Sequence, residues 1–222
     1  MIDLDAVVTR LARHYGPPEA PITRDPFEMI VLENVAYLAP DQRREEVFRK
    51  LQKRAGTTPA RILAAPLETL REIAALGGMY PDVRAQRLRE AARLARDEFG
   101  GDLRTIFKLD FAKARRALKK FPVIGEPGAE KILLFGGAHC HLALESNGLR
   151  VLVRLGAAEE HKNYATTYRR VQDALAGHTG TDCERLVSAH LLLKRHGQET
   201  CRRSDPSCNA CPLRKLCPYG MG

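Results

Sequence analysis

The segment "FAKARRALKKFPVIGEPGAEKILLFGG", residues 111 to 137, predicts a helix, a tight hairpin and a second helix. The first helix is basic and runs into Pro122, the turn closes at Gly125, and Pro127 restarts a helix. Glycine lets a backbone come close to a ligand, and the free amides at a helix N-terminus attract phosphate. The segment is therefore either a phosphate-binding site or an ordinary helix-helix turn. Phosphate contacts of this kind position a nucleic acid on the protein without reading its base sequence.

The rest of the chain also has the sequence pattern of short helices with short connections. "DPFEMIVLENVAYLA" opens with Asp25 as the expected N-cap and Pro26 at the first helical position. Apolar stripes that start at a cap or a proline recur in "DQRREEVFRKLQKRAG", "TPARILAA", "PLETLREIAALGG" and "YPDVRAQRLREAARLARDEFGG". The N-terminal stretch places apolar residues at helical spacing, at Leu4, Val8, Leu11 and Tyr15. No strand-like alternation competes, so we expect an all-α protein.

Length and composition indicate a folded protein with an anionic partner. The 222 residues are 44% apolar, enough for the core of one large domain or two small ones. No apolar run is long enough to span a membrane and the N-terminus lacks a signal-peptide pattern, so we expect a cytoplasmic protein. The net charge is +9, and two stretches are strongly basic. Their cations are Lys113, Arg115, Arg116, Lys119 and Lys120, and Arg202, Arg203, Arg214 and Lys215. Each run is either a DNA-binding face or a solvated helix face.

The tail "CRRSDPSCNACPLRKLC", residues 201 to 217, has the pattern of a metal site. Its four thiols are Cys201, Cys208, Cys211 and Cys217. In a reducing compartment such a set binds metal or takes part in catalysis more often than it forms disulfides. Four thiolates can hold a cubane iron-sulfur cluster. Zinc is the alternative, although it usually takes two Cys-x-x-Cys pairs and only one is present. Cys140 and Cys183 lie outside the tail, and we expect both to be buried free cysteines.

The hairpin and the cysteine tail, in this order, resemble the endonuclease III family of DNA glycosylases. The cysteine spacing is the family's own, "HGQETC" is similar to its approach to the cluster, and "DPFEMIVLENVAYLAPDQ" stands where its first core helix lies. The resemblance implies a [4Fe-4S] cluster on the tail cysteines. It also implies an all-α, two-domain helix-hairpin-helix fold, with residues 23–137 as the hairpin domain and 1–22 plus 138–222 as the cluster domain.

Members of that family flip a nucleotide out of the DNA stack and cut its base-sugar bond in a pocket between the domains. The cationic sugar of the transition state needs a nearby carboxylate. Glu145 stands where the family places its aspartate; alternatively, it only caps the helix that begins near Asn147. Strand-cutting members use a lysine just after the hairpin, but here Pro127 has that position. Lys131, one helical turn farther on, is expected on the solvated face, so we predict a monofunctional glycosylase.

Other positions depart from the family's pattern. Val123 replaces the first hairpin glycine, and Tyr37 and Leu38 stand near the family's DNA-probing glutamine. Either could wedge into the stack, although Tyr37 could equally be core. Glu33 and Asn34 are expected either to line the base pocket or to lie on the surface. The residues expected to contact DNA are Gly125, Gly128, Lys119, Lys120, Arg202, Arg203, Tyr37 and Leu38.

The expected partner is double-stranded DNA that carries a damaged or mismatched base, bound by a monomer, at the nucleoid if the source is prokaryotic. Two other classes stay open. One is a relative that binds damaged or distorted DNA and has lost catalysis, and the other is a zinc or redox-sensing regulator. The absent lysine and the altered aspartate favour loss of catalysis, whereas the retained carboxylate of Glu145 favours an enzyme.

Overall fold

The structure is a computed structural model that describes residues 2–36, 39–176 and 182–221. Over these residues the chain forms helices and connecting turns without any strand, so the predicted all-α class is confirmed. The chain divides into two compact units, Pro21–Ala138 and Met1–Ala20 with His139–Gly222. We call these the hairpin unit and the cysteine unit. Within the described ranges no helix is long and apolar enough to cross a bilayer.

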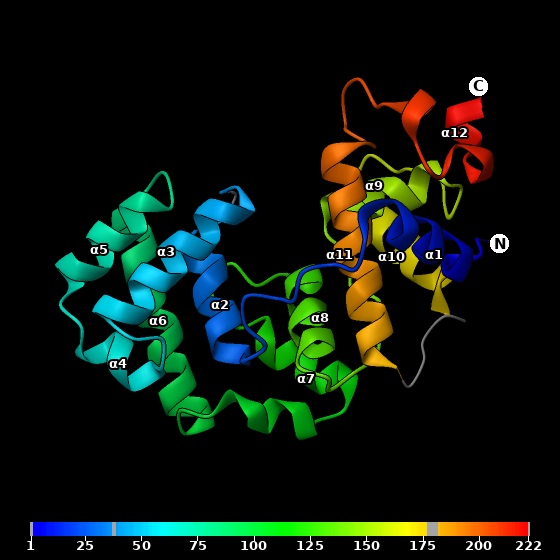
Figure 1. The fold of residues 1–222 in the computed structure, drawn as a ribbon. Coiled ribbons are helices and arrows are strands. Elements are labelled where there is room, and N and C mark those ends of the chain that lie inside the picture. Colours follow the sequence, from blue (N-terminus) through cyan, green and yellow to red (C-terminus); the bar gives the residue numbers. More distant parts are fainter. Residues whose placement is uncertain (1, 37–38, 177–181, 222) are drawn as a thin grey trace. The chain divides into compact units, whose positions relative to one another are not determined.

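The hairpin unit consists of helices joined by turns, among which α6 (Pro81–Phe99) is the longest (Figure 1). Its elements are α2 (Pro26–Val35), α3 (Asp41–Arg54), α4 (Pro59–Ala64), α5 (Leu67–Leu76), α6 (Pro81–Phe99), the 3-10 helix η1 (Leu103–Lys108), α7 (Phe111–Leu118) and α8 (Glu126–Phe135). Helix α6 packs against α2, α4 and α5. The start of α2 confirms its predicted cap, because Asp25 Oδ1 accepts the amides of Phe27 (3.0 Å) and Glu28 (3.1 Å). Helix α2 is buried on nearly every side, which explains its almost continuous apolar sequence.

The predicted helix-hairpin-helix is formed by α7, the turn and α8. The turn is anchored by Phe121 and Ile124, whose side chains are buried. Asn34, also buried, donates its side-chain amide to the carbonyl oxygen of Pro122 at 3.1 Å, which ties the turn to α2. Val123 has a φ of +68°, in the left-handed region where a β-branched residue is strained. The backbone of the hairpin therefore has the left-handed conformation that usually requires a glycine, although Val123 occupies the position.

The cysteine unit is centred on α11 (Figure 1). Its elements are α1 (Leu4–Tyr15), α9 (Ser146–Arg154), α10 (Tyr164–Ala174), α11 (Cys183–Glu199), the 3-10 helices η3 (Cys208–Ala210) and η4 (Arg214–Leu216), and α12 (Pro218–Met221). Helices α1 and α9 pack on α11. Gly197 makes the close approach of α9 possible, because a Cβ there would lie 2.7 Å from the backbone oxygen of Asn147. In α1 the core is formed by Leu4, Val7 and Leu11, whereas the predicted Val8 is only half-buried.

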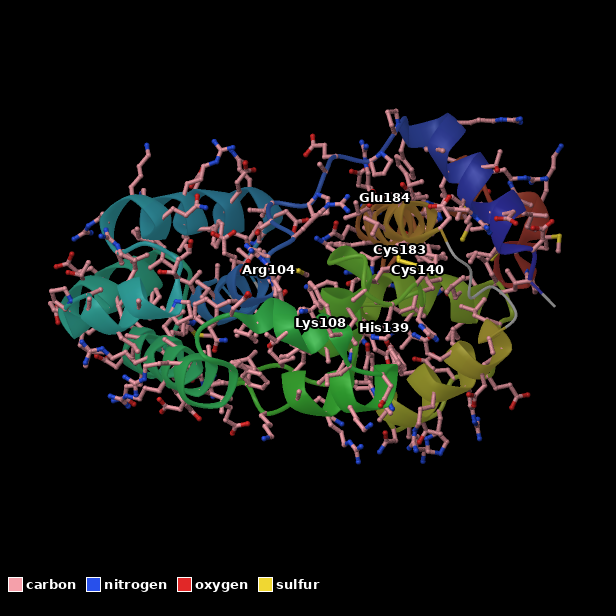
Figure 2. All side chains as sticks on the ribbon, turned by 90° about the horizontal axis from the view of Figure 1, so that it is seen from below. Arg104, Lys108, His139, Cys140, Cys183 and Glu184 are labelled. Atoms are coloured by element: carbon pink, nitrogen blue, oxygen red, sulfur yellow. A yellow bond between two sulfur atoms is a disulfide. The ribbon has the colours of Figure 1, made fainter. Side chains whose placement is uncertain are left out.

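The prediction for the two cysteines outside the tail is wrong. Cys140 and Cys183 are both half-buried and form a disulfide, with Cα atoms 4.6 Å apart and a separation of 43 positions along the chain. Figure 2 shows this bond in yellow at the start of α11. The pairing depends on how α11 meets a distant loop, so no local sequence pattern could have indicated it.

Candidate functional site

Glu145 is held at the end of an irregular but buried segment. Residues 139–145 have no regular secondary structure, and Leu142, Ala143 and Leu144 are buried in the cysteine unit. Glu145 is the N-cap of α9, because its Oε1 accepts the amide of Gly148 at 2.6 Å. Its Oε2 accepts the side-chain amide of Asn147 at 2.8 Å. The carboxylate therefore caps the helix, as the alternative interpretation expected, and its catalytic role stays a prediction.

A chain of hydrogen bonds connects this carboxylate with the cysteine tail. Arg150 Nη2 donates to Asn147 Oδ1 at 2.8 Å, and it also donates to the carbonyl oxygen of Gly197 at 2.6 Å. Arg150 Nε donates to the carbonyl oxygen of Cys201 at 2.9 Å. Burial lowers the pKa of this guanidinium, which nevertheless stays charged because an arginine pKa lies far above neutrality. Arg150 thus fixes Asn147, which in turn fixes Glu145.

The four tail cysteines, none of them in a disulfide, line one cavity. Burial raises the pKa of the Cys211 and Cys217 thiols, and the neighbouring thiols raise it further. Among the described residues, no three His, Cys, Asp or Glu side chains converge on a point that could hold a single metal ion. Four thiols around one cavity are the donor set of a metal centre, whose identity stays a prediction.

Arg154 organises the first part of this loop. Its Nη1 donates to Cys201 Sγ at 3.3 Å and to the carbonyl oxygen of Arg202 at 2.8 Å, and its Nη2 donates to the carbonyl oxygen of Arg203 at 3.1 Å. The guanidinium also lies over the ring of Tyr219, 4.4 Å from its centroid. One cation therefore holds the backbone of residues 202 and 203 and contacts one of the four sulfurs directly.

His196 contacts a second sulfur of the loop. Its Nε2 lies 3.5 Å from Cys211 Sγ, and its Nδ1 lies 2.9 Å from the hydroxyl of Tyr15. The Tyr15 hydroxyl is also 2.7 Å from Thr200 Oγ1. Burial lowers the pKa of His196 to about 4, so the imidazole is neutral at pH 7. When Tyr15 donates to Nδ1, the single ring proton is on Nε2 and points at the sulfur of Cys211.

Lys131 does not lie on a solvated face, which corrects the sequence-based expectation. Its ammonium forms an ion pair with Glu33, whose other partner is Arg44 at 2.9 Å. These three side chains come from α8, α2 and α3, and each is less than a quarter exposed. Burial opposes ionisation of Glu33, but the two cations outweigh it and lower its pKa to about 2. Asn34, beside Glu33 in sequence, is core and not surface.

The residues expected to contact phosphate are exposed to different degrees. Gly125 is exposed and is the N-cap of α8, with an extended backbone, and Gly128 packs its backbone near Ile124. Lys119 is exposed, and within the described residues it forms no ion pair; Lys120 is exposed and pairs with Glu98.

Acidic side chains offset the positive charge at two places expected to contact phosphate, the start of α8 and the tail. Glu126, in the first turn of α8, places a carboxylate beside the free amides, where its partner is Arg115 at 2.8 Å. In the tail, Arg202 and Arg203 are exposed, and Arg202 bonds to Asp205. The expected wedge residues Tyr37 and Leu38 lie outside the described residues.

An exposed apolar tip, formed by Met79 and Tyr80, is a feature that was not predicted from the sequence. Between α5 and α6, Met79 and Tyr80 are 73% and 71% exposed, and Tyr80 has a φ of +62°. Gly77, just before them, approaches α2 so closely that a Cβ would lie 2.1 Å from the carbonyl oxygen of Val35. The available signal was "GGMYP", in which two large apolar residues stand between turn formers.

Two helical units, one with a helix-hairpin-helix and one with a four-cysteine loop, define an all-α helix-hairpin-helix protein. No protein-family model matches the sequence. It is 25% identical over 201 residues to endonuclease III of Sulfolobus acidocaldarius, covering 89% of this chain and 83% of that protein. It is 23% identical over 211 residues to a thymine/uracil-DNA glycosylase of Pyrobaculum aerophilum, covering 94% and 87%. The solved structure of a trapped endonuclease III–DNA covalent intermediate matches with a TM-score of 0.78 and 20% identity, over 100% of this chain and 98% of that one.

In sequence the chain is distantly similar, and in fold closely similar, to the endonuclease III-like family of helix-hairpin-helix DNA glycosylases. The relatives cover nearly the whole chain, so the resemblance based on the hairpin and the tail extends through both units.

Proposed function

We propose that the protein is a monofunctional DNA glycosylase that hydrolyses the bond between a damaged or mismatched base and its sugar in double-stranded DNA. The observation that carries the proposal is the fixed carboxylate of Glu145, with one oxygen bonded to Asn147 and the other to the amide of Gly148. A carboxylate is the group that this reaction needs, because positive charge develops on the sugar as the base leaves.

Glu145 would act through a carboxylate oxygen that keeps a free lone pair. Each oxygen of an ionised carboxylate can accept more than one hydrogen bond, so the cap leaves capacity for a water or for the sugar cation. The bonds from Asn147 and Gly148 set the orientation, and Arg150 holds Asn147 in turn. An orientation set before substrate binds reduces the reorganisation needed in the transition state. In this role Glu145 accepts a proton from the attacking water, and the base leaves as the new C–O bond forms.

The absence of a lyase step is proposed from two positions on α8. Pro127, where the family's strand-cutting members have a lysine, carries no amine. Lys131 has an amine, but its ammonium is paired with Glu33. An ion-paired ammonium has no lone pair with which to attack the sugar, so the product strand would stay intact.

DNA binding is proposed for the hairpin, the basic residues around it and the apolar tip. The exposed Gly125 and the first amides of α8 offer a phosphate contact, and Lys119 adds an exposed positive charge nearby in sequence. Met79 and Tyr80 are the right kind of side chain to enter the gap left by a flipped nucleotide. We infer that this tip takes the role first assigned to Tyr37 and Leu38.

A [4Fe-4S] cluster is the cofactor that we infer for the tail. Cys201, Cys208, Cys211 and Cys217 would hold it, since all four thiols line one cavity and none is in a disulfide. When bound, the cluster would supply a rigid anchor for residues 201–217, whose own apolar core is small. Arg154 and His196 would then donate hydrogen bonds to two of its thiolates.

Excision assays on duplexes that each carry one lesion or mismatch test the proposal. We expect one substrate to lose its base, with the strand cut only after a separate alkali treatment. Strand cleavage without alkali would refute the proposal that the glycosylase is monofunctional. If no duplex in a broad panel loses a base, while damaged DNA is still bound more tightly than intact DNA, the non-catalytic alternative with Glu145 as a helix cap replaces the enzyme.

A further inference from the structure

The disulfide between Cys140 and Cys183 lies at the beginning of the segment that leads to Glu145. The chain enters the cysteine unit at His139, and Cys140 is the next residue. Figure 2 shows His139 beside the yellow bond that joins Cys140 to Cys183, the first residue of α11. Glu145 follows five positions after Cys140. The chain is therefore covalently attached to α11 just after it enters the unit and just before the candidate carboxylate.

The rest of the segment is held by side chains of two helices. Gln172 of α10 donates to the carbonyl oxygen of Leu142 at 2.8 Å, and His190 of α11 is 2.8 Å from the carbonyl oxygen of Ala143. Residues 139–144 form no helical hydrogen bonds, so these tertiary contacts determine their path. The disulfide is the one covalent contact among them.

Helix α11 also supports the other side of the carboxylate. Leu193 contacts the position of Gly148, whose amide binds Glu145, and Gly197 lies against Asn147. The segments before and after Glu145 therefore both pack on α11, a 17-residue helix. The segment before it is attached through Cys183 and His190, and the start of α9 packs against Leu193 and Gly197. A shift of the incoming segment relative to α11 would move Glu145 against the groups that orient it.

We propose that the Cys140–Cys183 disulfide is a positioning device for Glu145, and that its reduction slows base excision while DNA affinity is retained. A dithiol opens the bond: its two hydrogens end on the sulfurs of Cys140 and Cys183, and the dithiol becomes a cyclic disulfide. Once the cross-link is broken, residues 139–145 are held by hydrogen bonds and apolar contacts alone. The expected loss of excision rate rests on the proposed glycosylase function. The expected loosening of residues 139–145 does not.

The first measurement is independent of activity. The full-length protein, purified without oxygen, is alkylated with and without dithiothreitol, and peptides carrying Cys140 and Cys183 are analysed by mass spectrometry. We expect both to be protected until the dithiol is added. Hydrogen exchange is then measured over residues 139–148, and we expect it to accelerate by about tenfold or more on reduction because an anchor of the segment is lost. Labelling of both cysteines without reductant, or unchanged exchange, overturns the proposal.

The second measurement follows the reaction. Single-turnover excision by the reduced protein should be about tenfold slower than by the oxidised protein, because small misplacements of a catalytic group are costly, while the Kd for DNA stays within about twofold. Reoxidation by a small disulfide such as oxidised glutathione should restore the rate. The double variant Cys140→Ala/Cys183→Ala should be slow whether or not dithiothreitol is present, which controls for effects of the dithiol on the tail cysteines.

The outcomes separate the two proposals. If the unmodified protein excises no base, the proposed function fails and hydrogen exchange still decides whether the disulfide holds the segment. If exchange accelerates on reduction but the excision rate does not change, the disulfide is structural and its positioning role is refuted. If the double variant is as fast as the oxidised protein, the positioning role is refuted as well.

Discussion

Asn147 donates its side-chain amide to Glu145 Oε2 at 2.8 Å, so the candidate catalytic carboxylate is oriented by the residue two positions after it. The same Asn147 side chain accepts a hydrogen bond from Arg150, which bonds to the backbone of Cys201. The carboxylate and the four-cysteine loop, separated by more than fifty residues in sequence, are therefore parts of one polar network.

The first prediction concerns the charge of this carboxylate. Glu145→Gln keeps the shape of the side chain and one cap acceptor but removes the negative charge that the sugar cation needs. We expect the single-turnover excision rate to fall by about 10²-fold or more and the Kd for lesion DNA to stay within a few-fold. Glu160→Gln, an exposed position in the same unit, is the matched control and should leave both values unchanged. Undiminished excision by Glu145→Gln would place the catalytic carboxylate elsewhere.

The second prediction concerns Lys131 and the pH dependence of stability. The pKa of Glu33 is lowered to about 2, so its ion pairs stabilise the fold above the ordinary glutamate pKa and lose this contribution as the pH falls toward 2. Lys131→Met should lower the free energy of unfolding at pH 7 by roughly 1–3 kcal/mol, because Arg44 remains as a partner. The difference from the unmodified protein should shrink in acid. Chemical denaturation at pH 7 and pH 3 measures this difference in the free energy of unfolding. An equal difference at both pH values would contradict the ion pair between Lys131 and Glu33.

Borohydride trapping gives a third prediction, about the amine. A Schiff base with the DNA sugar would be reduced to a stable protein–DNA adduct, and we expect none from this protein because Pro127 has no amine and Lys131 is ion-paired. A lysine-dependent endonuclease III serves as the positive control. An adduct that forms with the unmodified protein and disappears in Lys131→Ala would show that this lysine leaves Glu33 and acts as the nucleophile.

The fourth prediction uses the acidic residue at the hairpin. Glu126 lies in the first turn of α8, where a phosphate would approach the free amides. Glu126→Gln should tighten binding to all duplexes by about threefold, since it removes a repulsion of up to about 1 kcal/mol. Lys119→Glu should weaken binding to all sequences alike and flatten its salt dependence. Binding isotherms at several salt concentrations test both, with the exposed Glu159→Gln as control. Unchanged affinity in both hairpin variants would place the DNA face elsewhere.

The fifth prediction concerns the cysteine loop. Purified without oxygen, the protein should be brown and contain about four iron atoms and four labile sulfides, and Cys208→Ser should lose the colour. Arg154→Gln should keep the iron but lower the reduction potential of the cluster, because Arg154 donates to Cys201 Sγ and its charge favours the more negative, reduced state. Arg202→Gln, at an exposed position, is the control. Stoichiometric zinc without iron would refute the cofactor.

Several features of the protein were readable from local sequence. Asp25 and Pro26 mark the start of α2, because a cap and a first-turn proline act within a few residues. The hairpin follows from the order of a basic helix, a proline, a glycine and a second helix. The spacing of the tail cysteines defines one compact loop, and the structure places all four around one cavity. Each of these signals depends on neighbours along the chain.

Only the tertiary structure decided which distant groups meet. Sequence alone put Lys131 on a solvated face and left Cys140 and Cys183 unpaired, whereas packing brings Lys131 to Glu33 and joins the two cysteines. A helical position can face water or another helix, and its periodicity does not say which charged partner a neighbouring helix supplies. The pairing of α2 with α8, and of the entry segment with α11, depends on how whole helices pack. The cap bonds of Glu145 are local, with Asn147 and Gly148, and the sequence indicated them. The groups that hold this cap in place, through Arg150 and the disulfide, join segments far apart in the chain, for which the sequence carries no local signal.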